Sequence, residues 1–269
     1  MPQPRFQLIV MDLDGTLLDS HSQVRPRTRA ALERAHNAGV AIAVATGRSY
    51  ALARHFTQGL PLSGPQITYN GAIVVEAESG RTVFLEAVPT ALIAPVLDFL
   101  REHDLYTCYF TEEHIYVRGR ADSERALVPP GFPQPIVEPN LERLIEGSPC
   151  LKLVAVATPA RIEAIRPLAE QTFGGRLYVT QTASVLLEFL HPKVSKGAAL
   201  GQAILDLGIT PAEVIAFGDS HNDIEMLTVA GIGVAMANAS AEVRAIADHI
   251  TPSNDDDGIA AALDELLWT

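Results

Sequence analysis

The stretch QLIVMDLDGTLLD (residues 7–19) decides the fold, because an apolar run ends in it at two acidic residues. The four apolar residues LIVM (8–11) are typical of a strand that enters a protein core. Asp12 and Asp14 follow at once, with one apolar residue between them. A buried carboxylate is costly unless it is paired, hydrogen-bonded or bound to a metal ion. The rest of the chain must therefore supply partners for these two carboxylates.

Other apolar runs end at small or polar residues in the same way: VAIAVA (40–45), EVIAF (213–217) and IGVAM (232–236). Their continuous apolar character indicates strands that are buried on both faces, as in a parallel sheet covered by helices. Helical spacing of apolar residues extends over Arg27–Ala38 and Lys196–Leu207, and a glycine follows each segment where a helix C-cap is expected. This alternation predicts a doubly wound, mostly parallel α/β domain of the Rossmann-like type.

The middle of the chain, residues 82–190, has shorter and more alternating apolar runs. Two segments are typical of antiparallel hairpins: TCYFTEEHIYVRG (107–119), with a turn at 111–113, and RLYVTQTASVLLEFL (176–190), with a turn at 181–184. Helices are predicted over Pro89–His103 and Pro159–Phe173. This region is therefore expected to form an α+β domain.

We predict that this α+β domain is inserted into the α/β domain. Residues 1–82 and 191–269 then form the core, and residues 83–190 form the insert. The Pro- and Gly-rich stretch VPPGFPQP (128–135) predicts an irregular loop within the insert. The length of 269 residues suits two domains, at roughly 150 residues for each.

Composition excludes several classes of function. With 48% apolar and 19% charged residues, the chain can build a packed core, and its net charge of −12 argues against a general nucleic-acid binder. We see neither a signal peptide nor an apolar run of about 18 residues, so we expect a cytoplasmic protein with no membrane partner. Cys108 and Cys150 lack metal-ligand or redox spacing and are predicted to be idle, buried thiols. No pattern indicates the oligomeric state.

In an open parallel sheet, ligands bind beyond the carboxyl ends of the strands. The conspicuous polar residues of the predicted core follow such strand ends: Asp12, Asp14, Thr46, Asp219 and Asp223. Several carboxylates at one sheet edge form an oxygen-rich site suited to Mg²⁺, a hard cation. A metal ion is thus the first partner that the sequence suggests for the two opening carboxylates.

The spacing of the acidic pair suggests chemistry as well. Residues i and i+2 of an extended segment point the same way, so both carboxylates can face one substrate. One carboxylate can attack phosphorus and form an aspartyl-phosphate, while the other protonates the leaving oxygen and later deprotonates water. Lys196, at a predicted helix start, can neutralise charge on the transferred group, and Thr46 can offer a hydroxyl to a phosphate oxygen.

Four motifs, in this order, resemble those of the haloacid dehalogenase-like phosphatases: DLDGT (12–16), ATGR (45–48), SKG (195–197) and GDSHND (218–223). The resemblance extends to the Cof-type sugar-phosphatase-like subgroup. It is carried there by YNGA (69–72), by the long insert between the second and third motifs, and by the tail that begins VAMANA (234–239). The resemblance covers nearly the whole chain.

This resemblance implies a role for each acidic residue of the motifs. Asp12 is implied to be the nucleophile and a metal ligand. Asp14 is implied to be the general acid/base and to lend its backbone carbonyl to Mg²⁺. Asp219 becomes the third protein ligand of the ion, and Asp223 lies behind the ligands, where it holds Lys196 or a metal-bound water.

The remaining motif residues are implied to serve the phosphoryl group. Thr46, Lys196 and Asn222 contact it, while Gly47 and Arg48 line its approach. The implied activity is Mg²⁺-dependent hydrolysis of small phosphorylated metabolites, with sugar phosphates as the leading class. The insert is then a cap that closes over the substrate and sets specificity.

Two other functions stay open at this point. A phosphomutase or phosphotransferase has a similar core and passes phosphate to a sugar hydroxyl. A receiver-like signalling module stores phosphate on an aspartate of a doubly wound sheet. The acid/base position of Asp14 and the large insert both count against the receiver.

Several of these residues also have structural interpretations. Thr46 can be the N-cap of the following helix. Asn70 can fix the turn before Gly71, with substrate contact as the alternative. The acidic run NDDD (254–257) is expected to be an exposed loop whose last residue caps a final helix that begins near Gly258.

Overall fold

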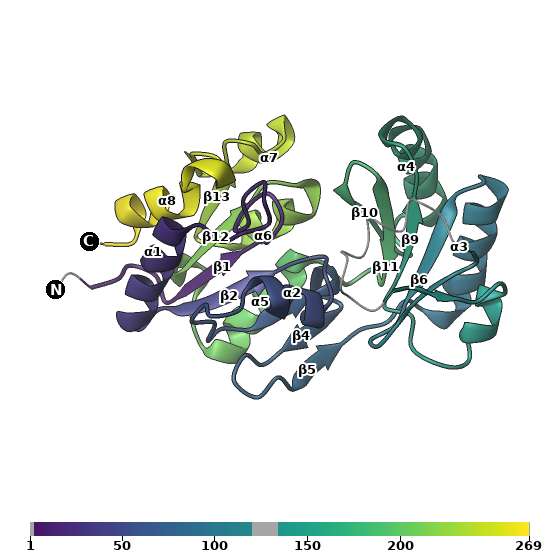
Figure 1. Ribbon diagram of the computed structural model, residues 1–269, viewed down its shortest axis with the longest axis horizontal. Helices are drawn as coiled ribbons and strands as arrows, with labels where there is room; N and C mark the ends of the chain where they lie inside the picture. The colour runs from purple at the N-terminus through teal and green to yellow at the C-terminus, as the bar shows by residue number, and fades with distance from the viewer. Residues whose placement is uncertain (1–2, 120–133, 269) are drawn as a thin grey trace. The chain divides into compact units, whose positions relative to one another are not determined.

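The computed structural model describes residues 3–119 and 134–268 (Figure 1). It divides into two compact units: unit 1 is Met1–Leu85 with Ser195–Thr269, and unit 2 is Glu86–Val194. Most of the loop predicted at 128–135 lies outside the described residues.

Unit 1 is built on an eight-stranded sheet with the strand order β14-β13-β12-β1-β2-β3-β4-β5. Its strands are β1 (Leu8–Met11), β2 (Ala41–Ala45), β3 (Gln66–Thr68), β4 (Ile73–Val75), β5 (Thr82–Leu85), β12 (Val214–Gly218), β13 (Ile232–Met236) and β14 (His249–Thr251). The strands from β14 to β3 are parallel, and β4 and β5 are added antiparallel at one edge. The prediction of a doubly wound, mostly parallel α/β core is confirmed.

Helices cover both faces of this sheet (Figure 1). They are α1 (Pro26–Asn37), α2 (Tyr50–Phe56), α5 (Lys196–Leu207), α6 (Ile224–Val229), α7 (Ala241–Ile246) and α8 (Gly258–Leu266). In β1, Ile9 and Met11 pack with α1 and α8, whereas Leu8 and Val10 pack with α5 and α6. Alternate residues of a strand point to opposite faces, so both faces of β1 are buried, and this explains its unbroken apolar run.

Of the two N-caps expected from the sequence, the first is wrong, and the second is confirmed in its position but not in its side-chain hydrogen bond. Thr46 is not the N-cap of α2, because Ser49 holds that position and its hydroxyl accepts a hydrogen bond from the Leu52 N–H. Asp257 does precede α8, but its side chain makes no capping hydrogen bond. Its carboxylate instead accepts a hydrogen bond from Thr28 and pairs with Arg25. Partners from distant parts of the chain therefore outcompete the local cap.

Unit 2 is built on a six-stranded sheet with the order β10-β11-β9-β6-β7-β8. Its strands are β6 (Tyr106–Phe110), β7 (Ile115–Val117), β8 (Ile136–Val137), β9 (Lys152–Val156), β10 (Tyr178–Ala183) and β11 (Leu186–Leu190), and its helices are α3 (Thr90–Glu102) and α4 (Pro159–Phe173). Both predicted hairpins are antiparallel as expected. The second hairpin turns later than predicted, at Ser184 and Val185.

The hydrophobic core of unit 2 includes an aromatic cluster between its sheet and its helices. Phe189 of β11 meets Phe173 of α4 and Phe99 of α3 edge to face, with ring centroids 5.7 and 6.4 Å apart. Cys108 and Cys150 are both buried and are not joined in a disulfide, as the sequence predicted. Unit 2 therefore has a hydrophobic core of its own.

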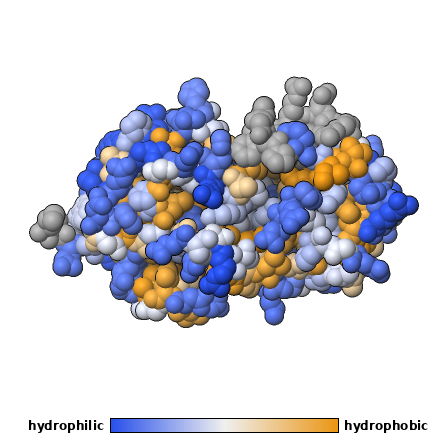
Figure 2. Space-filling model, turned by 60° about the horizontal axis from the view of Figure 1, so that its bottom comes forward, coloured by the Kyte–Doolittle hydropathy of each residue, from blue (hydrophilic) through white to orange (hydrophobic). Residues whose placement is uncertain are grey.

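The surface combines polar cover with apolar patches, as the face drawn in Figure 2 shows. On the edge strand β5, the residues Val83, Phe84 and Leu85 are all exposed. No helix within residues 3–119 and 134–268 is long and apolar enough to cross a membrane.

We expect the substitution Phe189→Ala to lower the free energy of unfolding by about 3–5 kcal/mol, because it removes a fully buried ring and leaves a cavity. Urea denaturation followed by circular dichroism measures this change. The control is Leu168→Ala on α4, where the side chain is 40% exposed and the expected change is within about 0.5 kcal/mol. Equal effects of the two substitutions would contradict the aromatic core.

Candidate active site

The site begins where β1 ends, at Asp12. Strand β1 lies between β12 and β2, so the carboxyl ends of three parallel strands meet at this edge. The Asp12 N–H donates to the carbonyl of Phe217 at 3.0 Å, which continues the pairing with β12 by one residue. The Asp12 side chain is buried, so its carboxylate needs partners.

Lys196, the first residue of α5, is one such partner. Its Nζ donates to Asp12 Oδ1 and to Asp223 Oδ1, both at 2.7 Å, and its side chain is fully buried. Burial by itself lowers the pKa of Lys196, but the carboxylates of Asp12 and Asp223 outweigh burial and raise it. The ammonium is therefore charged at neutral pH and bridges two carboxylates.

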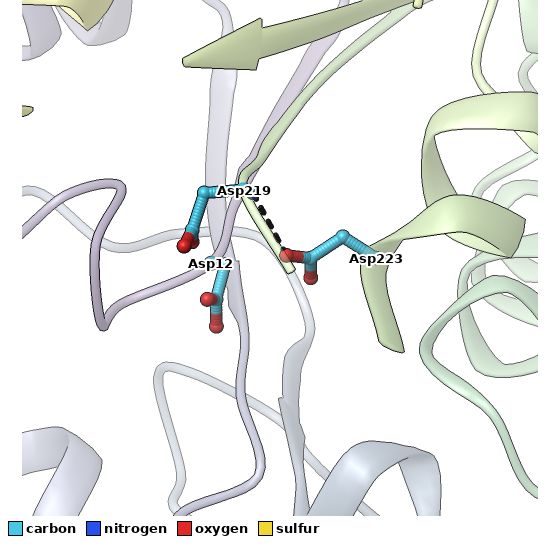
Figure 3. Close-up of side chains that lie close together, drawn as sticks. All are labelled: Asp12, Asp219 and Asp223. Carbon is cyan, nitrogen blue, oxygen red and sulfur yellow. Dashed lines mark hydrogen bonds between the residues drawn. The ribbon is translucent and has the colours of Figure 1, made fainter. Parts of the chain in front are cut away.

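Three carboxylates gather around this point (Figure 3). Asp12, Asp219 and Asp223 each offer an oxygen, and these oxygens lie within 4.8 Å of one another. Burial raises the pKa of Asp12 well above its ordinary value, and Lys196 opposes this rise only in part. Burial, together with the charge of Asp223, raises the pKa of Asp219 to about 6.

The charges in this cluster favour a bound cation. Three carboxylates and the single ammonium of Lys196 leave a formal charge of −2 when all are ionised. Such an excess in a buried place is unfavourable without a counter-ion. The donor set consists of hard oxygen atoms, which fits a divalent cation such as Mg²⁺ or Ca²⁺.

Asp219, which follows β12, is held by hydroxyls at both of its oxygens. Thr16 donates to Oδ1 at 2.9 Å and Ser220 donates to Oδ2 at 3.0 Å. Gly15, with φ of 77°, lies so close that a Cβ there would be 2.5 Å from Oδ2. Neither Thr16 nor Ser220 is among the site residues predicted from the sequence, although the DGT motif was a signal that could have pointed to Thr16.

Asp223 contacts both Lys196 and the backbone at Asp219. Its Oδ2 accepts the backbone N–H groups of Asp219 and Ser220, each at 3.0 Å, and Figure 3 draws the first of these bonds. Its Oδ1 is the one that binds Lys196. Both oxygens of Asp223 are thus occupied in orienting other residues of the site.

Asp14, the second acidic residue of the opening motif, is not part of the three-carboxylate cluster. Arg48 holds it in a two-pronged ion pair, with Nε 2.6 Å from Oδ2 and a terminal nitrogen 2.5 Å from Oδ1. The guanidinium also lies over the ring of Phe56, 4.4 Å from its centroid. The Asp14 side chain is 52% exposed, so it is accessible to a ligand as well.

The other predicted residues lie at the same edge of the sheet. Thr46 follows β2 and is buried, and its hydroxyl accepts the Arg48 N–H at 3.2 Å across Gly47. Asn222 is buried in the short helix η5 (His221–Asp223), and its side chain donates to the side chain of Asn70. The structure therefore brings all of the predicted site residues to unit 1.

Comparison with known proteins identifies the family to which this chain belongs. The chain matches the model of the haloacid dehalogenase-like hydrolases over residues 9–263. It belongs to that family, as the four motifs predicted, and it is an enzyme of the phosphatase type.

The chain is similar over most of its length to individual relatives and to solved structures. The HMP-PP phosphatase of Cronobacter sakazakii is 33% identical over 248 residues, which cover 91% of this chain and 89% of the relative. A chloroplastic endoribonuclease YBEY of Arabidopsis thaliana is 30% identical over 97% of this chain, which spans 46% of that protein's length. A haloacid dehalogenase-like hydrolase structure from B. subtilis has a TM-score of 0.86 at 29% identity, covering 97% of this chain and all of that one.

From the raised pKa of Asp219 we predict how the free energy of unfolding changes with pH. Between its ordinary value of 3.8 and about 6, the folded protein binds more protons than the unfolded chain, so stability decreases as the pH rises through this window. In excess chelator at pH 7, Asp219→Asn should therefore raise the free energy of unfolding by about 1–3 kcal/mol. Urea denaturation at several pH values tests this.

The gain from Asp219→Asn should shrink as the pH falls and vanish near pH 3, where the wild-type carboxyl is largely protonated in both states. Asp206→Asn, at an exposed position on α5, is the control and should show no such trend. A gain that is the same at pH 4 and pH 7 would contradict the electrostatic explanation.

Proposed function

We propose that this chain is a Mg²⁺-dependent phosphatase that hydrolyses small phosphorylated metabolites, with sugar phosphates as the leading substrate class. The observation that carries the proposal is the buried Asp12 carboxylate, paired with Lys196 beside a cluster of negative charge. A carboxylate kept ionised by an ammonium and a cation is a competent nucleophile towards phosphorus. The phosphatase type of the family supports the same conclusion.

The proposed reaction has two steps. In the first, an Asp12 oxygen attacks phosphorus and the bond to the leaving oxygen breaks, while Asp14 gives that oxygen a proton. In the second, Asp14 takes a proton from water, which attacks phosphorus and releases phosphate from Asp12. Lys196 balances the negative charge on the phosphoryl oxygens in both steps.

The same residues fit the metal ion that the proposal needs. Asp12, Asp219 and the backbone carbonyl of Asp14 are the groups that would hold it, and a bound Mg²⁺ supplies positive charge beside the phosphoryl oxygens. Thr16 and Ser220 fix the orientation of Asp219 for this purpose. Asp223 fixes Lys196 from behind.

We further propose that Arg48 orients the ionised Asp14 for the second step, and that one of its two hydrogen bonds opens when Asp14 carries the proton used in the first step. Its two hydrogen bonds hold the Asp14 carboxylate beside the edge of the sheet, and the ring of Phe56 supports the guanidinium. A two-pronged pair of this kind fixes geometry as well as charge. Thr46, Gly47 and Asn222 complete the proposed contacts with the phosphoryl group.

Selection among substrates is proposed to lie in the inserted domain, residues 83–190. The residues at the edge of the sheet in unit 1 are proposed to bind the phosphoryl group, which all substrates of this class share. The organic part of the substrate must then be recognised by other residues.

Phosphate release from a panel of sugar phosphates, nucleotides, flavin mononucleotide and pyridoxal phosphate tests the proposed activity. We expect release in Mg²⁺ and a decrease on the order of a hundredfold or more in excess chelator, reversed when Mg²⁺ is restored. Undiminished release in chelator would contradict the metal requirement. Faster transfer to an added sugar than to water would instead indicate a phosphotransferase.

Replacing Asp12 with Asn should abolish turnover, with a loss on the order of a thousandfold or more, because the amide is not a nucleophile. Steady-state phosphate release under the best conditions of the panel measures this loss. Asp206→Asn is the matched control and should keep wild-type activity. Wild-type-like turnover by Asp12→Asn would refute the mechanism.

A further inference from the structure

Two buried asparagines from distant parts of unit 1 pair through their side chains. The Nδ2 of Asn222 donates to the Oδ1 of Asn70 at 2.9 Å, although 152 positions separate the two residues in the sequence. Asn70 is fully buried and Asn222 is 4% exposed. Asn222 is a predicted phosphoryl contact, so whatever orients its amide affects the site directly.

The backbone that presents Asn70 is strained. Tyr69, Asn70 and Gly71 form the short helix η1 (Tyr69–Gly71) and have φ values of 49°, 57° and 100°, all in the left-handed region. Non-glycine residues rarely adopt this conformation, and such strain persists only where its surroundings hold it. A strained turn that carries a buried polar side chain is therefore a candidate for a functional role.

The turn contacts two segments that carry residues of the candidate site. The Asn70 N–H donates to the carbonyl of Thr46 at 2.9 Å. On the other side, a Cβ on Gly71 would lie 2.4 Å from the carbonyl oxygen of Ser195, the residue before Lys196. The turn is thus wedged between the loop that carries Thr46 and the start of the helix that carries Lys196.

An asparagine amide has two N–H donors and one carbonyl acceptor, and rotation by half a turn exchanges them. A phosphoryl oxygen accepts hydrogen bonds, so only the N–H end of Asn222 can bind it. Asn70 accepts a hydrogen bond from one of the two N–H groups of Asn222, and this bond fixes the orientation of the Asn222 amide. The Oδ1 of Asn222 is buried and has no partner among residues 3–119 and 134–268, so it can accept from a donor that a ligand or its water supplies.

We propose that Asn70 is a positioning residue that locks the amide of Asn222 with its second N–H directed to the phosphoryl group. The inference rests on the proposed function, because it needs a phosphoryl group at this edge of the sheet. A merely structural Asn70 would affect stability alone. A positioning Asn70 acts through Asn222, and this difference can be measured.

The test is a double-mutant cycle with Asn70→Gly and Asn222→Ala. Glycine adopts φ of 57° without strain, so Asn70→Gly removes the side-chain acceptor and leaves the turn intact. Losing one hydrogen bond that orients a contact should lower kcat/KM about tenfold. In the Asn222→Ala background the same substitution should change kcat/KM by less than about twofold, because the amide it positions is absent.

Inorganic phosphate is the second probe, measured by calorimetry in Mg²⁺. Its affinity should fall in Asn70→Gly by a factor similar to that in kcat/KM, and it should not fall further in the double variant. This probe needs no turnover, so the cycle can be completed even if the substrate panel is silent. Wild-type phosphate affinity in Asn70→Gly, or losses that multiply in the double variant, would overturn the inference.

Thermal unfolding of every variant separates positioning from folding. If Asn70→Gly does not fold, Asn70→Ser replaces it, because serine partly fills the space and is too short to accept the same hydrogen bond. The outcomes for the two proposals are distinct. Full activity in Asp12→Asn refutes the proposed phosphatase mechanism, whereas an intact phosphatase that is indifferent to Asn70 refutes only the positioning role.

Discussion

The bridge made by the buried ammonium of Lys196 is the interaction on which the rest of unit 1 depends. It joins the end of β1, through Asp12, to the segment after β12, through Asp223. A buried charge without a partner costs several kcal/mol, so removing either carboxylate would leave an unfavourable group in the core. The start of α5 must therefore lie at the carboxyl edge of the sheet, where both carboxylates are.

The same bridge leaves the site short of positive charge. One ammonium cannot neutralise three carboxylates, and burial, together with this excess of negative charge, raises the pKa values of Asp12 and Asp219. A divalent cation is the kind of group that such a site attracts. The excess of buried negative charge therefore lowers the stability of the fold at this edge of the sheet. The left-handed turn at Asn70 adds backbone strain at the same place.

Much of the fold could be predicted from the sequence, because its signals are local. The run 8–11 is apolar at every position since both faces of β1 are covered, and the predicted helix at 196–207 has the observed bounds. One of the errors has a cause that lies outside the local sequence. Asp257 pairs with Arg25 and Thr28 instead of capping α8, and no local pattern announces partners more than two hundred positions away.

The sequence by itself determined the order of the motifs, the residue types that carry the chemistry and the alternation of strands and helices. These follow from spacing and side-chain chemistry, which are properties of short segments. Only the tertiary structure decided which groups are partners: Arg48 for Asp14, Thr16 for Asp219 and Asn70 for Asn222. Each of these pairs joins residues that are distant in the chain, and they meet only because parallel strands bring their carboxyl ends to one edge of a sheet.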